Sequence, residues 1–166
     1  MKPSALSRPN ARKIDWKTKW IDIASITFDE TKIIYEDYIG GKPKRVKLDT
    51  IDTTPFNPNH WRITLDKFAM NNSQLLYNKD FGKPTPNVFD EEHLLLNNIN
   101  LDLEKLVIID DTLTSKIHQL QATDRCGFQI KDLQANAKIS PISSRLDNLL
   151  LVTNNSTIRD YYEMQY

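Results

Sequence analysis

A short polar triplet recurs four times along the chain at nearly even spacing, and this periodicity constrains the fold more than any other feature. Each triplet follows a short apolar stretch, and the third positions lie 42, 39 and 44 residues apart. The four copies are Asp29-Glu30-Thr31, Asn71-Asn72-Ser73, Asp110-Asp111-Thr112 and Asn154-Asn155-Ser156. Self-similarity with a period of about 20 to 50 residues is typical of stacked repeats. The sequence therefore predicts repeat units that begin near residues 20, 61, 99 and 145.

The first two copies agree over much more than the triplet. At a constant offset of 42, eight pairs of positions keep their chemical character. These pairs are Ile21/Ile63, Ile23/Leu65, Ile26/Phe68, Phe28/Met70, Thr31/Ser73, Ile33/Leu75, Ile34/Leu76 and Tyr35/Tyr77. The agreement predicts a true duplication. The third and fourth copies share only the triplet and the apolar stretch before it, so chance similarity is an open alternative there.

The triplets have a direct physical interpretation. Asp, Asn, Ser and Thr side chains bond neighbouring backbone groups and tolerate turn conformations. Each triplet is therefore predicted to end one strand and redirect the chain into the next, with a β-bulge as the alternative. Upstream of the triplet, both copies change phase at the same place, where Ile21 and Ile23 give way to Ile26 and Phe28. This shared change predicts a bulge or a tight corner that belongs to the repeat.

Period-two alternation extends through most of the chain. In the segment 132–139 every odd position is apolar and every even position is polar, which predicts a strand with one dry and one wet face. Further strands are predicted over 46–51, 93–103, 113–120, 128–130 and 145–153. We expect an all-β protein of roughly ten strands. Its predicted architecture is an elongated, curled antiparallel sheet with a groove or solenoid-like repeat layers, and at most a short helix.

Composition and charge indicate one domain preceded by a basic segment. Residues 1–18 have no periodic apolar pattern and are predicted to be a basic flexible tail or linker, whereas residues 19–166 are predicted to form a single β-repeat domain. Lys and Arg together number 22, as do Asp and Glu, so the net charge attracts no nucleic acid. A basic cluster over 42–47 is interpreted as a solvated strand face, with a phosphate site as the alternative. No apolar stretch approaches the length of a membrane span.

Few residues offer catalytic or metal-binding chemistry. Cys126 is the one cysteine, which excludes an internal disulfide, and no two histidines have the spacing of metal ligands. Carboxylates gather in Asp90-Glu91-Glu92 and Asp110-Asp111, and paired acids are the machinery of glycoside hydrolases. Both runs, however, lie at predicted turns, where charged residues are common. We therefore expect no enzyme activity, no metal and no cofactor.

Several segments carry a pattern found in a known family. They are Trp20-Ile21-Asp22-Ile23, Ile33 to Tyr38, Phe89 to Leu101, Ala122 to Leu133 and Leu149 to Ser156. Together they resemble the large AsmA-like proteins of Bacteroidetes known as TamB, after the translocation and assembly module. In these proteins a charged residue, a small residue and Gly precede an apolar strand, and Cys126 stands here where Ser or Asn is more common. The resemblance covers roughly residues 16 to 166 and implies a fragment of a larger protein.

The resemblance implies both a location and an activity. Members of the family look like long periplasmic proteins with an inner-membrane anchor, which in this case would lie outside the fragment. Their strands curl into an elongated groove with an apolar lining that is implicated in moving phospholipid toward the outer membrane. An older view makes them scaffolds or chaperones for the assembly of outer-membrane proteins. Phospholipid acyl chains and outer-membrane assembly proteins are thus the implied partners.

The alternating pattern suits a lipid groove physically. The dry face of a curled sheet would shield acyl chains while the polar face meets water, at about 0.8 kcal/mol per buried methylene. The candidate lining positions are Ile63, Leu65, Leu95, Ile99, Leu101, Leu103, Leu133, Ala135, Ala137, Ile139, Leu149 and Leu151. The alternative is that these residues fill a closed core between two sheets.

Overall fold

The computed structural model describes residues 10–36, 55–79 and 83–166, which form nine strands and no helix. The all-β prediction is thereby confirmed. The strands are β1 (Asn10–Asp15), β2 (Trp20–Asp29), β3 (Lys32–Glu36), β4 (Arg62–Asn78), β5 (His93–Ile109), β6 (Thr112–Asp124), β7 (Gln129–Ser140), β8 (Ser143–Thr153) and β9 (Thr157–Gln165). The predicted strand 46–51 and the basic cluster 42–47 lie outside the described residues.

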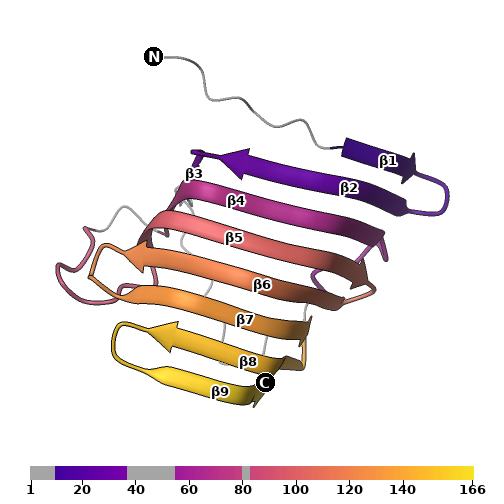
Figure 1. Ribbon diagram of the computed structural model, residues 1–166. Helices are drawn as coiled ribbons and strands as arrows, with labels where there is room; N and C mark the ends of the chain where they lie inside the picture. The colour runs from indigo at the N-terminus through magenta and orange to yellow at the C-terminus, as the bar shows by residue number, and fades with distance from the viewer. Residues whose placement is uncertain (1–9, 37–54, 80–82) are drawn as a thin grey trace, which may run out of the picture.

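The strands form one open, curled sheet (Figure 1). Its order is β1-β2-β4-β5-β6-β7-β8-β9, and β3 lies beside the second half of β4. From β4 to β9 the chain runs as an antiparallel meander. The sheet is nevertheless mixed, because β2 and β3 both run parallel to β4. β1 pairs with β2, so residues 10–15 of the predicted tail belong to the sheet.

The sequence duplication appears in the structure as a parallel ladder. Every residue of β2 and β3 that pairs with β4 lies beside the residue 42 positions further along the chain. The offset found by comparing the two copies is therefore the register of the ladder. Like side chains stack as a result: the rings of Tyr35 and Tyr77 lie 5.2 Å apart and within 10° of parallel. Because equivalent side chains occupy neighbouring sites, both strands require the same alternation and the same irregularities.

The four triplets take two different structural roles. Asp110-Asp111-Thr112 and Asn154-Asn155-Ser156 lie at the hairpin turns β5–β6 and β8–β9, as predicted. Asp29-Glu30-Thr31 separates β2 from β3, yet both strands continue along β4 in one register. The prediction of a strand end is wrong for Asn71-Asn72-Ser73, which lies inside β4. There the ladder to β5 is shifted, so the bulge alternative holds for this copy.

Pairs of polar residues interrupt the alternation at six places in the described strands and their junctions, and we call each pair a polar step. The second residue of each pair has a positive φ, which places it in the left-handed region. The steps, with that φ, are Asp29-Glu30 (47°), Asn71-Asn72 (43°), Asn97-Asn98 (51°), Glu104-Lys105 (54°), Asp147-Asn148 (52°) and Arg159-Asp160 (82°). In a regular strand, residues three apart point to opposite faces. Leu96 and Ile99 nevertheless pack in one cluster, because the step between them restores the phase.

At the step in β4 and the matching step after β2, the freed backbone groups are bonded by polar side chains. Ser73 is 1% exposed, and its Oγ accepts a hydrogen bond from Thr31 N (3.2 Å) and donates one to Asn71 O (3.1 Å). Asn72 N donates to Asn100 Oδ1 at 3.0 Å. Unpaired buried backbone groups would cost about 1–3 kcal/mol each. The steps are thus specific, hydrogen-bonded elements of the sheet.

The described part of the chain is a single layer. All contacts between strands join sheet neighbours, so no described strand packs across another strand's face. Seven apolar side chains of the described residues are less than 9% exposed, and three of these are alanines. Most other apolar side chains of the sheet are half-buried. A structure of this kind leaves apolar surface accessible on one side.

The left-handed step in β4 yields a direct test of the fold. Asn72→Val places a β-branched side chain at φ 43° and is expected to lower the free energy of unfolding by about 1–2 kcal/mol. Asn72→Gly is expected to be tolerated, since glycine adopts this conformation without steric cost. Urea unfolding followed by circular dichroism measures both. The matched control is Asn136→Val, at an exposed position of β7 with ordinary φ, and equal destabilisation by the two valines would contradict the account.

Candidate functional site

Apolar side chains from five neighbouring strands gather on one side of the sheet, which we call the apolar face. Met70, Ile99 and Ala122 are buried at the centre of this cluster. The half-buried side chains packed against them are Phe28, Ile33, Phe68, Leu75, Leu96, Leu101 and Leu120. They come from β2, β3, β4, β5 and β6. The steps allow each long strand to contribute residues from both of its halves to the same face.

Register extends the apolar face across the rest of the sheet, because directly paired residues share a face. Phe68 pairs with Leu103, Leu103 with Ile117 and Ile117 with Ala135, which carries the face into β7. Eleven of the twelve predicted lining residues lie on this face by the same argument. They are Ile63, Leu65, Ile99, Leu101, Leu103, Leu133, Ala135, Ala137, Ile139, Leu149 and Leu151.

Leu95 is the predicted lining residue that the structure places on the opposite face. Its partner in β4 is Leu76, whereas the next residue, Leu96, pairs with Leu75 of the apolar cluster. Counting every second residue back from Ile99 assigns Leu95 to the apolar face. The step at Asn97-Asn98 shifts the side-chain alternation by one residue, so Leu96 lies on that face instead. The signal was present in the sequence: this Asn pair follows a short apolar stretch, Leu94-Leu95-Leu96, as Asn71-Asn72 follows Phe68-Ala69-Met70.

The apolar face changes in depth and exposure from β6 to β9. Ala122, Ala135 and Ala137 are buried, and their short side chains lie between longer apolar side chains of the neighbouring strands. Toward β9 the face opens: Ile139 is 41% exposed and Ile158 is 48% exposed. No described element covers these residues. The face is therefore a strip of apolar surface with a row of small residues along β6 and β7.

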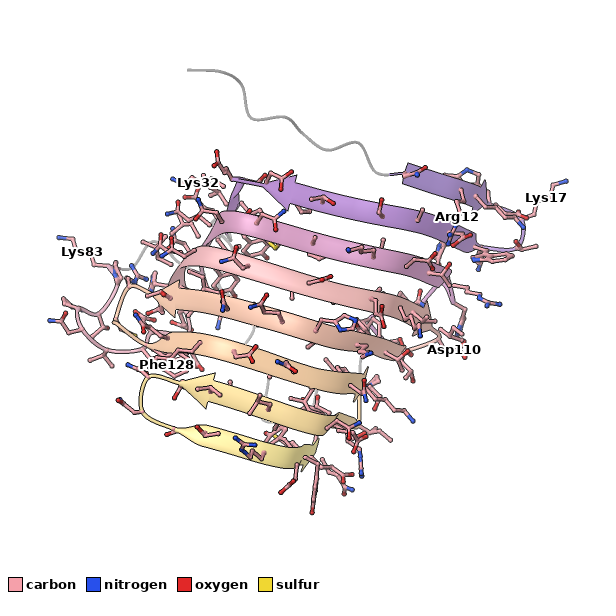
Figure 2. The ribbon with its side chains drawn as sticks, in the orientation of Figure 1. Arg12, Lys17, Lys32, Lys83, Asp110 and Phe128 are labelled. Carbon is pink, nitrogen blue, oxygen red and sulfur yellow. The ribbon has the colours of Figure 1, made fainter. Side chains whose placement is uncertain are left out.

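The opposite face carries charged side chains that bond one another. Arg12 contacts Asp22 through Nη2 (2.7 Å) and Asp66 through Nη1 (2.6 Å). The hydrogen bond from Arg12 holds the pKa of Asp22 below its usual value. Near the other edge, Arg145 contacts Glu163 of β9 at 3.0 Å. Figure 2 shows polar atoms projecting from the viewed side along the sheet. Ion pairs of this exposed kind orient the polar face toward water and contribute little stability.

Two hollows lie beside the steps. One, of about 330 Å³, is lined by residues that include Asn98, Gln121 and Lys131. The other, of about 530 Å³, is lined by residues that include Asn148 and Arg159. Among the described residues, no group of three or more His, Cys, Asp or Glu side chains is arranged to hold a metal ion.

The segment after β6 forms a tight turn around a buried carboxylate. Asp124 is 4% exposed, and its Oδ2 accepts a hydrogen bond from Cys126 N (2.9 Å) while Oδ1 accepts one from Leu95 N (3.3 Å). Burial acts to raise the pKa of Asp124, but the hydrogen bonds outweigh it and the pKa is lowered. Gly127 completes the turn at φ 88°, a conformation that favours glycine. This turn is the charged, small and Gly pattern noted in the sequence.

The residues with possible chemistry are dispersed. The Asp124 carboxylate beside Cys126 raises the pKa of the thiol, which favours its protonated, unreactive form. Each histidine has its own carboxylate at 3.1 Å: Asp110 for His60, Asp90 for His93 and Glu104 for His118. The acidic runs at 90–92 and 110–111 lie at separate ends of β5. Within the described ranges these groups form no shared centre.

No protein-family model, curated protein or solved structure matches this chain. Its described residues contain no helix long and apolar enough to cross a bilayer. The geometry of the apolar face is therefore the main evidence on function.

The buried turn predicts a pH-dependent stability. Folding lowers the pKa of Asp124, so its carboxylate stabilises the folded state above the ordinary Asp pKa of about 4, and this stabilisation disappears as the pH falls through the lower folded-state pKa. Asp124→Asn is expected to reduce the free energy of unfolding by about 1–3 kcal/mol at pH 7. The difference from the unsubstituted protein should shrink on acidification.

Urea unfolding at several pH values measures this effect. Asp102→Asn, at a half-buried position of β5 without a side-chain hydrogen bond to any described residue, is the matched control and should change stability little. A pH-independent loss in Asp124→Asn would contradict the assignment of this carboxylate.

Proposed function

We propose that this chain is a periplasmic segment of an AsmA/TamB-like protein, and that its apolar face forms part of a hydrophobic groove for phospholipid transport between the inner and outer membranes. The observation that carries the proposal is an apolar face that runs across β2 to β9 without a second layer of described elements over it. Folding normally buries such a face, because exposed apolar area is unfavourable in water.

Acyl chains fit this face better than a compact polar ligand does. A methylene chain gains about 0.8 kcal/mol per buried CH₂ and needs no directional partner. Toward β9 the accessible part of the face includes Ile139 and Ile158, which are 41% and 48% exposed. Headgroups would remain in water. The resemblance to TamB-like proteins supports the choice of phospholipid and of the cell envelope.

The proposal predicts that charge on the apolar face removes lipid. After expression in bacteria, the unsubstituted chain should retain phospholipid that native mass spectrometry and lipid extraction detect. The double variant Ile139→Lys/Ile158→Lys, at accessible positions of the face, should retain several-fold less, since each ammonium would have to be desolvated beneath an acyl chain.

The matched control carries the same two charges elsewhere. Ile142→Lys lies at the β7–β8 turn, 68% exposed, and Ile34→Lys lies on the opposite face of β3, 55% exposed. This double variant should retain lipid as the unsubstituted chain does. Absence of phospholipid from the unsubstituted protein, or equal loss in both double variants, would contradict the proposal.

A second candidate is a scaffold that assists the assembly of outer-membrane proteins, and the edge strands β1 and β9 of the described sheet favour it. An exposed edge strand presents unpaired backbone groups to which an extended client segment can add. A peptide copied from an unfolded β-barrel strand separates the two functions. Under the lipid proposal it should leave the amount of bound phospholipid unchanged. Tight binding of the peptide, with displacement of lipid or without any lipid present, would favour the scaffold.

A further inference from the structure

All three tryptophans of the chain lie at one corner of the sheet, formed by residues 16–20 and 61–62, which we call the Trp corner. Trp16 is in the β1–β2 turn, Trp20 begins β2, and Trp61 immediately precedes β4. Trp20 pairs with Arg62 in the parallel β2–β4 ladder, so the three rings lie at the same end of their strands. We propose that the Trp corner docks on the surface of a phospholipid bilayer that contains anionic lipid.

The corner presents aromatic surface to its surroundings. Trp16 is 74% exposed, more than any other large apolar side chain of the described residues. Its ring meets the ring of Trp61 edge to face, with centroids 5.2 Å apart and planes at 90°. This contact supports the Trp16 ring without burying it. Tryptophan joins a large apolar ring to a polar N–H group, and for that reason it is enriched where a bilayer meets water.

Basic side chains surround the rings. The Trp20 ring has Lys13 Nζ at 4.4 Å from its centre and the Arg62 guanidinium at 5.0 Å. Lys17 and Lys19 belong to the β1–β2 turn and have no carboxylate partner among the described residues. Figure 2 shows Lys17 projecting away from the sheet at this end. Lysines so placed attract anionic headgroups, which lie at the depth that interfacial tryptophan prefers.

The carboxylates near the corner are bonded to other groups of the chain. Arg12 bonds both Asp22 and Asp66. Asp15 Oδ1 accepts hydrogen bonds from two backbone N–H groups of the β1–β2 turn, at 2.9 Å and 3.1 Å. The adjacent turn at Asp110-Asp111 bonds the segment that precedes β4. The lysines of the β1–β2 turn are therefore the charges left to meet an external anion.

A bilayer surface suits this combination better than a soluble anion or a nucleic acid does. A bilayer offers headgroups to the lysines and the acyl boundary to the rings at once. A free phosphate would leave the Trp16 ring in water. Nucleic-acid binding draws mostly on the neutralisation of phosphates, and two lysines in a chain with 22 basic and 22 acidic residues supply little of it.

Docking at the Trp corner does not depend on the apolar face. The corner lies at the ends of β2 and β4, whereas the accessible residues Ile139 and Ile158 belong to β7 and β9, several strands away in the sheet. Lipid bound along the face and a bilayer beneath the corner are separate contacts. The docked corner would place the described sheet beside one membrane.

Intrinsic fluorescence isolates this corner, because the chain has no tryptophan elsewhere. Vesicles of phosphatidylcholine and phosphatidylglycerol should carry the chain down on sedimentation. Its tryptophan emission should shift to the blue and be quenched by lipids brominated in their acyl chains. Vesicles of phosphatidylcholine alone should bind several-fold less, and added salt should weaken binding to the anionic vesicles, since salt screens exposed charges.

A variant of the corner and a matched control locate the contact. Trp16→Ala/Lys17→Glu should lower the vesicle partition coefficient about tenfold, because it removes the exposed ring and reverses one charge at the surface. The control Phe89→Ala/Lys83→Glu removes a ring that is 56% exposed and reverses an exposed lysine at the opposite end of the strands. The control should bind vesicles as the unsubstituted chain does.

The variant Ile139→Lys/Ile158→Lys separates docking from lipid retention on the apolar face. It should bind anionic vesicles as the unsubstituted chain does, whether or not it retains phospholipid. Failure of the unsubstituted chain to sediment with anionic vesicles, sedimentation without a change in tryptophan emission, or equal loss in the corner variant and its control would overturn the proposal. Loss of vesicle binding in Ile139→Lys/Ile158→Lys, or an emission shift that single-stranded DNA produces and vesicles do not, would overturn it as well.

Discussion

The polar step is the constraint on which the rest of this structure depends. A strand as long as β4 or β5 cannot keep strict alternation and still bend with a curled sheet. A two-residue step with one residue at positive φ bends the strand and restores the phase of the side chains. Residues such as Leu96 and Ile99 therefore share a face despite odd spacing. Without the steps, the apolar side chains in half of each long strand would lie on the polar face of the sheet.

Parallel pairing makes this constraint cooperative across strands. Because β2 and β3 lie beside β4 at a constant offset of 42, a step in one must be matched by a step in the other. Ser73 joins the two: its hydroxyl accepts from Thr31 N and donates to Asn71 O. The first two copies of the polar triplet thus match because the neighbouring strands need the same interruption at the same register position. The apolar face is uninterrupted for the same reason.

The sequence predicted side-chain placement correctly in the segments where a single repeat offset or a single alternation continues without interruption. The 42-residue offset predicted which residues lie side by side, and the regular alternation of 132–139 placed Leu133, Ala135 and Ala137 on the correct common face. Leu95 was misplaced because a step changes the phase without changing the composition of the segment. The parallel arrangement of β2 and β4 was missed as well, since side-chain alternation is the same in parallel and antiparallel strands. Only the hydrogen-bond pattern distinguishes them.

The central claim is that one face of this sheet meets acyl chains while the other meets water. Leu133 and Gln134 test it most directly, because they are neighbours in β7 with side chains on opposite faces. A photoreactive amino acid is placed at each position in turn, and protein from irradiated bacteria is analysed by mass spectrometry for phospholipid adducts. The account predicts adducts at position 133 and none at 134. Equal labelling at both positions, or none at 133, would contradict it.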